Sequence, residues 1–354
     1  MTDLDHGRSL RLGDPGGMLD AVSALSDHAR GGYAAGLDVA GAPSADGVTA
    51  LAFCGMGGSA VAGDVLRAVY RERLGIPVEV VRTPVLPAYC GPHTLVVASS
   101  YSGNTAETLA CFREARDRGC RVIVVTSGGS LAAEAADVGG VAAVQGGSQP
   151  RAALGWLAFA TIGALVSVGL LPDAADDVDE AVAELAALAS KLGPSVPAHE
   201  NLAKELAHRL GDRIPVIWGA EGIGAVAAAR WKTQFNENAK IPAFTSSMSE
   251  LDHNEVVGWV HPHGEGFSVI ALRHDGEDRE VAARFPLSLE IAHDAGASVE
   301  EFRAAGRSSL AQFFSLIALG DFASVYHALL HGVDPTPVAA IDRLKAALAG
   351  GPLA

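Results

Sequence analysis

The 354-residue sequence is poor in basic residues, and this limits the partners it can have. It contains 26 Lys and Arg against 41 Asp and Glu, a formal net charge of −15, and no run rich in Lys or Arg occurs along it. Proteins that bind nucleic acid use clustered positive charge to meet the phosphate backbone. The sequence therefore predicts no nucleic-acid partner.

Cysteine is also scarce. The four cysteines, Cys54, Cys90, Cys111 and Cys120, form no Cys-x-x-Cys pair, and a chain of this length does not need a disulfide framework to fold. This usage is typical of a protein in a reducing compartment, and we expect the protein to be cytoplasmic.

Long hydrophobic runs are missing as well. The first residues lack the basic segment followed by an apolar one that marks a secretory signal. The longest apolar stretch, residues 154–171, is interrupted by Thr161, Ser167 and three glycines. We interpret this stretch as a buried helix and expect no membrane span.

What is present is the composition and patterning of a globular α/β protein. Hydrophobic residues make up 49% of the chain and charged residues 19%, which is close to globular usage. The beginning of the chain shows only weak helical periodicity, but from about Val48 short apolar runs alternate with Ala- and Leu-rich helical segments. Such alternation predicts a doubly wound, mostly parallel sheet flanked by helices. The predicted strands are 49–54, 77–81, 94–99, 121–125 and 140–144.

The pattern starts again in the second half of the chain. The apolar run 214–218 leads into a glycine turn at Gly219 and an Ala-rich helix, just as 50–54 leads into a turn at Gly55, 164 residues earlier. This repeat predicts two similar α/β subdomains.

The expected organisation has three parts. Residues 1–45 form an N-terminal helical extension, residues 46–172 the first subdomain, and residues 173–354 the second subdomain with C-terminal helices. Long helical segments are expected on both sides of the boundary, at 152–171 and 173–192.

The first chemical signal is the glycine-rich turn Gly55-Met56-Gly57-Gly58-Ser59-Ala60. Read as G-x-G-x-x-A it is a weak dinucleotide fingerprint, with Glu79 near the spacing of a ribose-binding acid but inside an apolar run. A turn of this kind can also serve only to pack a helix against a strand. A third interpretation is a phosphate-binding turn at a helix N-terminus.

A second turn, Ser99-Ser100-Tyr101-Ser102-Gly103-Asn104-Thr105, favours phosphate binding. Its hydroxyl groups, together with backbone N–H groups at a helix start, can surround a dianionic phosphate. Ser and Thr are also ordinary helix caps, but one such residue is enough for a cap. The similar turn 126–130 fits either role equally well.

These turns resemble the phosphate-binding turns of sugar isomerase (SIS) domains, and later segments resemble the bifunctional phosphoglucose/phosphomannose isomerases more specifically. The segments that carry this likeness are residues 236–244, 250–259, 320–324 and 332–338, and the resemblance runs from about residue 50 to Lys345. It implies two SIS-type subdomains with an active site between them. It also implies an enzyme that interconverts glucose 6-phosphate or mannose 6-phosphate with fructose 6-phosphate.

The resemblance also assigns roles to residues. Glu237 is implied to move a proton between C1 and C2, Arg151 to stabilise the enediolate, and His253 to open the ring from the neighbouring subunit. Lys345 matches a C-terminal lysine that approaches the sugar. Aldose–ketose isomerisation needs such a base, cation and acid. Each residue also has a plainer interpretation: a solvated face for Glu237 and Lys345, an interface histidine for His253, and a loop cap for Arg151.

The phosphate ligands follow from the same resemblance, and no metal or cofactor is expected. His261 and His263 lie in a Pro- and Gly-rich loop without a Cys or carboxylate partner at an interpretable spacing. The residues implied to bind phosphate are Gly57, Gly58, Ser59, Ser100, Ser102 and Thr105.

Two hypotheses of different classes follow. The first is a metal-free hexose 6-phosphate isomerase that works as a homodimer. The alternative is a non-catalytic SIS-type protein that binds a sugar phosphate and regulates another process. A regulator would normally carry a further domain, and residues 1–45 are too short and too acidic for a helix-turn-helix.

Overall fold

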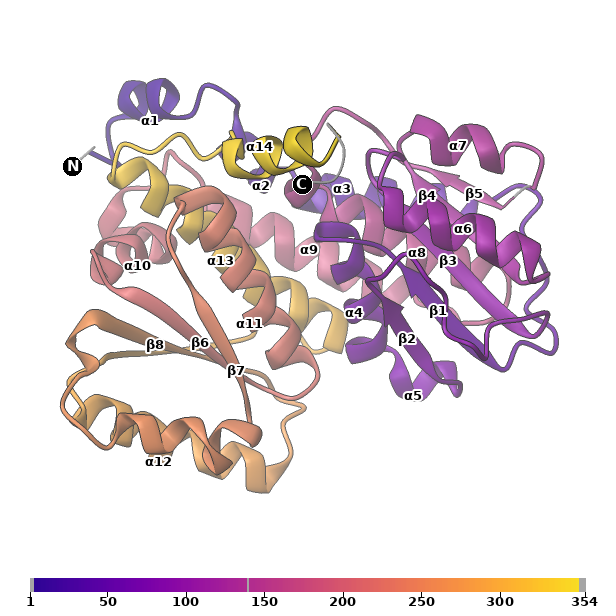
Figure 1. The fold of residues 1–354 in the computed structure, drawn as a ribbon. Coiled ribbons are helices and arrows are strands. Elements are labelled where there is room, and N and C mark those ends of the chain that lie inside the picture. The colour runs from indigo at the N-terminus through magenta and orange to yellow at the C-terminus, as the bar shows by residue number, and fades with distance from the viewer. Residues whose placement is uncertain (1–2, 139, 350–354) are drawn as a thin grey trace.

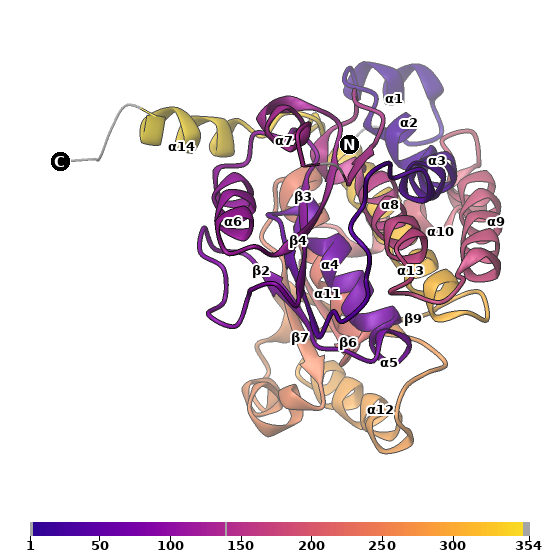
Figure 2. The same cartoon turned by 90° about the vertical axis from the view of Figure 1, so that its right-hand side faces the viewer.

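The computed structural model describes residues 3–138 and 140–349, which form two parallel β-sheets with helices around and between them (Figures 1 and 2). The alternation of strands and helices predicted from the sequence is confirmed. In the first sheet the strand order is β2-β1-β3-β4-β5. Its strands are β1 (Ala50–Cys54), β2 (Val78–Val81), β3 (Thr94–Ser100), β4 (Arg121–Thr126) and β5 (Val141–Ala143).

The second sheet has the order β7-β6-β8-β9, and it too is parallel throughout. Its strands are β6 (Ile214–Ala220), β7 (Phe244–Met248), β8 (Phe267–Arg273) and β9 (Ser298–Arg303). In each sheet the chain passes from a central strand to one neighbour and then crosses to the other side. A parallel sheet wound in this way opens a crevice at the carboxyl ends of its two central strands.

Helices cover both faces of each sheet, as the continuous burial of the central strands requires. On the first sheet, α4 (Gly58–Val69) and α8 (Leu154–Ser167) lie on one face, and α6 (Ala106–Asp117) and α7 (Gly129–Ala135) lie on the other. On the second sheet, α10 (Leu202–Leu210), α11 (Ile223–Gln234) and α13 (Ser309–Leu330) share one face, and α12 (Arg279–Asp294) covers the other.

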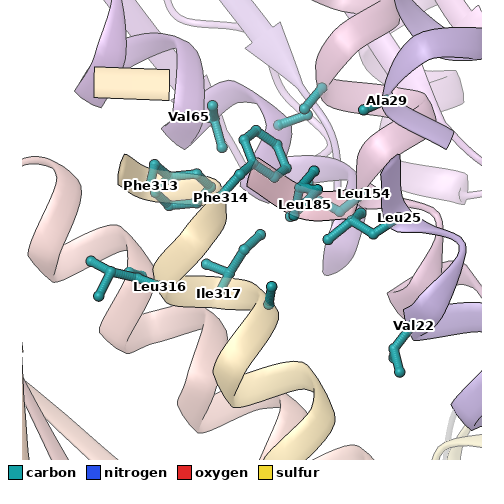
Figure 3. Close-up of a cluster of buried hydrophobic side chains, with 14 of the residues drawn as sticks. Val22, Leu25, Ala29, Val65, Leu154, Leu185, Phe313, Phe314, Leu316 and Ile317 are labelled. Carbon is teal, nitrogen blue, oxygen red and sulfur yellow. The ribbon is translucent and has the colours of Figure 1, made fainter. Parts of the chain in front are cut away.

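The largest hydrophobic core lies between the two sheets and joins them. Figure 3 shows its centre, where Phe313 and Phe314 of α13 lie near Val65 of α4 and Leu154 of α8. By length and composition α13 could cross a membrane, but it is fully buried inside the protein. It is therefore a core helix, which explains why it is apolar all round.

Three helices precede the first strand and belong to this core: α1 (Gly7–Gly13), α2 (Met18–Ser23) and α3 (Leu25–Leu37). The backbones of α3 and α8 approach so closely that a Cβ on Gly36 would lie 2.1 Å from the carbonyl oxygen of Ala160. Further along, α9 (Ala175–Leu192) packs against both α3 and α13. The weakly periodic first residues thus include a helix, α3, whose glycines allow a close approach to α8.

Candidate functional site

The predicted phosphate-binding turns lie together at the crevice of the first sheet. The turn that contains Gly57 follows β1, and the turn that contains Ser102 follows β3, the two strands on either side of the point where the chain changes direction. A Cβ on Gly55 would lie 3.2 Å from the carbonyl oxygen of Ser99, so the two turns touch through their backbones.

The third turn, after β4, packs against the second one. Gly103 has φ +67°, and a Cβ there would lie 1.8 Å from the carbonyl oxygen of Gly128; Gly129, with φ +69°, faces Ser102 in the same way. Only glycine fits these positions, because both the backbone angle and the space exclude a side chain. The glycines therefore bring three hydroxyl-bearing turns into one cradle.

The helices that begin at this cradle have no side-chain cap. Among the described residues, no side chain at the N-cap positions Gly57, before α4, and Thr105, before α6, accepts a hydrogen bond from the first turn of its helix. The Thr105 hydroxyl lies 2.9 Å from the Ser100 hydroxyl, and the Ser59 hydroxyl accepts a hydrogen bond of 3.3 Å from the Tyr101 N–H. Uncapped N–H groups together with hydroxyl groups suit a phosphate dianion.

Arg151 lies in the short helical turn η1 (Pro150–Ala152), beside the start of α4. A Cβ on Gly58 would lie 3.0 Å from the carbonyl oxygen of Pro150, which places this loop next to the cradle. The Arg151 side chain is buried and donates to Asn238 Oδ1 at 2.6 Å and to the carbonyl oxygens of Pro335 and Thr336 at 2.7 Å. A guanidinium held at three positions keeps a fixed direction.

Glu237 lies in a π-helical turn, η3 (Phe235–Ala239), at the end of α11. One of its carboxylate oxygens, Oε2, is 3.9 Å from Nη1 of Arg151, and 31% of the Glu237 side chain is exposed. Burial lowers the pKa of Arg151, while the Glu237 carboxylate opposes that shift. The structure thus brings together two predicted site residues that lie 86 positions apart in the sequence.

Three further residues, none of them predicted to have a role, support this pair. Arg230 on α11 is buried, forms a two-point ion pair with Asp321 on α13, and donates a hydrogen bond of 2.5 Å to the carbonyl oxygen of Arg151. Burial raises the pKa of Asp321, and the charge of Arg230 opposes that rise. Asp321 lies in segment 320–324, which carries part of the family resemblance, and an acidic residue inside an apolar helix is the signal that could have predicted the ion pair.

Lys240 is the third supporting residue. It has φ +60°, and its Nζ donates to the carbonyl oxygens of Glu237 at 2.5 Å and of Pro335 at 2.9 Å. Burial, followed by the charge of Arg151, lowers the pKa of Lys240. It ties the Glu237 turn to the segment that also holds Arg151.

His253 and Lys345 do not join the site within this chain. His253 ends the short helical turn η4 (Glu250–His253), and its side chain is exposed, while the neighbouring Asp252 is anchored to α12 by a hydrogen bond of 2.7 Å from Ser288. Lys345 is exposed on α14 (Ala339–Ala349), which projects from the body of the protein in Figure 2. Within residues 3–138 and 140–349, no ion pair or hydrogen bond joins either side chain to Arg151 or Glu237.

The structure also bears on two alternative interpretations of the sequence, a ribose-binding role for Glu79 and a metal site. Glu79 is the second residue of β2, so it lies away from the carboxyl end of that strand, where a ribose would be held. Over residues 3–138 and 140–349, no group of three or more His, Cys, Asp or Glu side chains is placed to hold a metal ion.

Comparison with known proteins identifies both halves of the chain. Residues 49–144 match the model of the SIS domain, and residues 199–348 match that of the bacterial phospho-glucose isomerase C-terminal SIS domain. A glucose-6-phosphate isomerase like protein from Thermus thermophilus has the same fold, with a TM-score of 0.63 over 98% of this chain and 99% of that one at 22% identity.

Sequence relatives show the family more closely. A bifunctional phosphoglucose/phosphomannose isomerase from Caldicellulosiruptor bescii is 40% identical over 336 residues, which cover 94% of this chain and 99% of the relative. A protein of the same name from Aquifex aeolicus is 36% identical over 83% of this chain and 89% of the relative. The chain therefore belongs to the family of bifunctional phosphoglucose/phosphomannose isomerases, SIS-domain enzymes of sugar-phosphate isomerisation.

Proposed function

We propose that this protein interconverts glucose 6-phosphate and mannose 6-phosphate with fructose 6-phosphate through an enediolate. The observation that carries the proposal is the Arg151–Glu237 pair beside the cradle formed by the turns after β1, β3 and β4. A base, a fixed cation and a phosphate anchor are the parts that this chemistry needs.

In this proposal Glu237 moves the proton. Its carboxylate takes the proton from C2 of the open-chain aldose, and the C1 carbonyl oxygen becomes the enediolate oxygen. The hydroxyl proton of O2 passes to O1, and the carboxylate returns its proton to C1, which gives the ketose with its carbonyl at C2. Arg151 offsets the negative charge that develops on the oxygen, and its buried, hydrogen-bonded side chain needs no rearrangement at that moment. The guanidinium supplies this charge without a metal ion or a cofactor.

The phosphate is proposed to bind at the N-termini of α4 and α6. The ligands are the backbone of Gly57 and Gly58 and the hydroxyl groups of Ser59, Ser100, Ser102 and Thr105. Anchoring at C6 leaves the C2 hydroxyl free to have either configuration. Both aldoses can then react if the phosphate supplies most of the binding.

We propose that a second copy of this chain completes the site as a homodimer. The segment that carries His253 exposes Val257 and Val260, each 68% accessible, and Phe244 on the neighbouring edge strand is 55% accessible. On α14, Leu344 is 61% exposed beside Lys345. Large apolar side chains next to two predicted site residues that find no site in their own chain support an interface there.

The four free cysteines support a reducing, cytoplasmic location. In that compartment the proposed reaction belongs to glycolysis and gluconeogenesis, at the level of the hexose phosphates.

The test is turnover of fructose 6-phosphate in the presence of EDTA, with glucose 6-phosphate and mannose 6-phosphate followed separately. We expect both products, and we expect Glu237→Gln to lower kcat by about 10³-fold. Glu290→Gln, on the exposed surface of α12, is the matched control. One product alone would contradict the dual specificity, and tight binding of a hexose phosphate without turnover would favour the regulatory alternative.

A further inference from the structure

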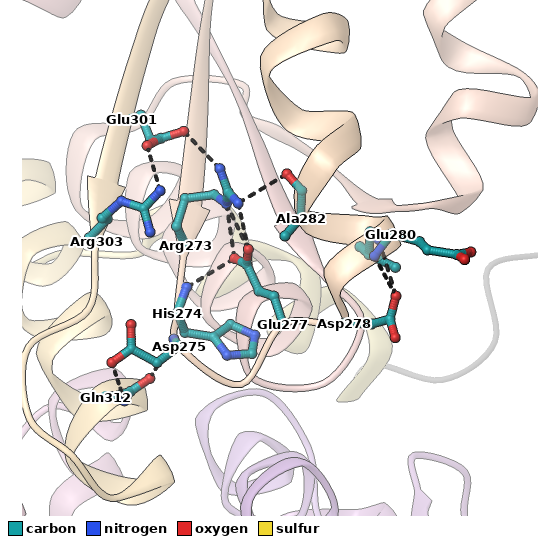
Figure 4. Close-up of polar contacts among 11 residues, drawn as sticks. Arg273, His274, Asp275, Glu277, Asp278, Glu280, Ala282, Glu301, Arg303 and Gln312 are labelled. Atoms are coloured by element: carbon teal, nitrogen blue, oxygen red, sulfur yellow. Dashed lines mark hydrogen bonds and ion pairs between the residues drawn. The ribbon is translucent and has the colours of Figure 1, made fainter.

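Arg151 differs from the other buried arginines in the kind of partner that holds it. Three arginine side chains are buried in the part of the chain that the structure describes, and two of them, Arg230 and Arg273, form close ion pairs with carboxylates. Figure 4 shows Arg273 with Glu277 and Glu301. Within residues 3–138 and 140–349, the hydrogen bonds of the Arg151 side chain all go to neutral oxygen atoms.

These neutral partners leave the charge of Arg151 available. They are Oδ1 of Asn238 and the carbonyl oxygens of Pro335 and Thr336. The Glu237 carboxylate lies 3.9 Å from the guanidinium, which is longer than a hydrogen bond. A buried cation without a directly bonded carboxylate can act on an oxygen that becomes negative during a reaction.

Asn238 lies at the centre of this arrangement. It directly follows Glu237 in the π-helical turn at the end of α11, and its side chain is fully buried. Its Oδ1 accepts a hydrogen bond of 2.6 Å from Nε of Arg151, and its Nδ2 donates one of 3.0 Å to the hydroxyl group of Ser324 on α13. The residue next to the proposed base therefore also holds the proposed cation.

The orientation of the Asn238 amide is fixed from both sides. The Ser324 hydroxyl group donates its one hydrogen to the carbonyl oxygen of Asp321 at 2.8 Å, so its oxygen can only accept from Asn238. On the other side, the guanidinium of Arg151 has donors only. The amide must therefore turn its NH₂ group to Ser324 and its oxygen to Arg151.

An aspartate at position 238 would hold Arg151 at least as firmly as the asparagine does. The two side chains have the same shape, and a carboxylate accepts a stronger hydrogen bond from a guanidinium than an amide oxygen does. The aspartate would also place a full negative charge against the guanidinium and offset its positive charge. Substitution at this position can therefore separate the direction of Arg151 from its available charge.

We propose that Asn238 is a positioning residue for the isomerisation proposed for this protein, on which this role rests. It fixes the direction of Arg151 through a neutral acceptor and so keeps the charge of the guanidinium for the enediolate oxygen. Ser324 on α13 sets the orientation of the Asn238 amide. Both side chains are fully buried and act through Arg151. Because the enediolate is charged only during the reaction, these residues affect kcat and not KM.

The main test is Asn238→Asp, assayed with fructose 6-phosphate in the presence of EDTA. We expect kcat to fall about 100-fold, while KM changes less than about threefold. Circular dichroism and thermal denaturation verify the fold. If Asn238 only held Arg151 in place, the aspartate would replace it and kcat would stay near that of the unaltered protein. That result would overturn the proposal.

The matched control is Asn236→Asp, which adds the same charge on the other side of Glu237. The Asn236 side chain donates a hydrogen bond of 2.9 Å to the carbonyl oxygen of Ile241, and it is only partly buried. We expect kcat of this variant to stay within about fivefold of the unaltered protein. Equal losses of kcat in Asn236→Asp and Asn238→Asp would mean that a nearby negative charge is enough, and would overturn the role of Asn238.

Ser324→Ala tests the orientation of the amide without adding a charge. It removes the acceptor of the Asn238 NH₂ group, and we expect kcat to fall about tenfold with KM unchanged. Ser315→Ala is the control on the same helix. Ser315 also donates to the carbonyl oxygen three residues earlier, that of Gln312 at 2.8 Å, but it accepts from the N–H of Ala305 instead. Equal kcat values for these two variants would overturn the role of Ser324.

Turnover by the unaltered protein separates this proposal from the proposed function. If the unaltered protein does not isomerise fructose 6-phosphate, the proposed function is wrong and the role of Asn238 fails with it. If the unaltered protein is active and Glu237→Gln is not, the function stands. An Asn238→Asp variant with normal kcat would then overturn the positioning role alone.

Discussion

The two crevices of this protein have the same topology but satisfy their helix N-termini differently. In the first, neither α4 nor α6 has a side-chain cap, and hydroxyl groups surround the free N–H groups. In the second, α11 is uncapped, but the equivalent of α6 is α12, whose first N–H groups are bonded to Asp278. A side-chain cap occupies N–H groups that a ligand could otherwise use.

The two crevices also differ in how their arginine side chains are held. The first presents neutral hydroxyl groups, and its cation, Arg151, is fixed by buried hydrogen bonds. At the second, Arg273 is neutralised by Glu277 and Glu301, as Figure 4 shows. Two copies of one fold can therefore present different chemical groups through changes at the ends of a few strands.

The largest effect is expected where the first crevice depends on the second half of the chain. Asp321→Asn removes the carboxylate that pairs with Arg230 and leaves a buried guanidinium without its counter-charge. We expect a loss of about 3 kcal/mol in the free energy of unfolding, measured by urea denaturation. Because Arg230 also holds the carbonyl oxygen of Arg151, kcat should fall as well.

Glu134→Gln is the control for this prediction. It breaks the pair between Arg113 and Glu134, in which the arginine side chain is 57% exposed. Water screens an exposed pair, so we expect little or no change in the free energy of unfolding. Equal losses of unfolding free energy in the two variants would mean that burial does not increase the contribution of the Arg230–Asp321 pair to stability.

The next effect comes from making the first crevice resemble the second. Thr105→Asp gives α6 the kind of cap that Asp278 gives α12. A carboxylate in the cradle repels the substrate phosphate, and we expect KM for fructose 6-phosphate to rise about 100-fold, or about 2.7 kcal/mol. Steady-state kinetics measures this, and circular dichroism verifies the fold. An unchanged KM would place the phosphate elsewhere.

The reverse change should have a smaller effect and should not alter catalysis. Asp278→Ala removes the side-chain cap of α12. The Asp278 carboxylate accepts hydrogen bonds from the N–H groups of Glu280 and Val281 at 2.8 and 3.3 Å. We expect the free energy of unfolding to fall by about 1 kcal/mol, measured by thermal or urea denaturation. A large loss of turnover would show that the cap serves the active site.

The smallest expected effect on stability concerns the start of α13. There a carboxylate on another helix accepts hydrogen bonds from backbone N–H groups. Glu180 on α9 accepts hydrogen bonds of 2.8 Å from the N–H groups of Arg307 and Ser308. Although desolvation opposes the shift, these bonds lower the pKa of Glu180 to about 2. The stabilisation is present above the unfolded pKa of about 4.3 and is lost as the pH falls towards 2.

Glu180→Gln should therefore cost about 1 kcal/mol at pH 7 and progressively less below pH 4. Urea denaturation of both proteins at pH 7 and pH 3 measures the difference. A cost that stays constant with pH would mean that the charge of Glu180 does not contribute to the stability.

The strands of the first sheet, β6 and the long helices could be predicted because each has its own apolar pattern, whereas β8, the apolar strand FSVIALR in the middle of the second sheet, was not predicted. The run 94–99 is β3, at 94–100, and the segment 173–192 contains α9, at 175–192. The edge strands β7 and β9 gave no such signal. Their sequences, FTSSM and SVEEFR, include polar and charged residues because one edge of each strand has no neighbouring strand.

The sequence by itself determined the α/β class, the two repeated halves, and the turns in which hydroxyl groups meet a helix start. These features are local, since a strand, a turn and a cap each depend on a few consecutive residues. Tertiary structure alone decided that Arg151 meets Glu237, that Arg230 and Asp321 support them, and that His253 and Lys345 stay outside. Contacts between residues tens of positions apart depend on how the two sheets pack around α13, and no local pattern records that packing.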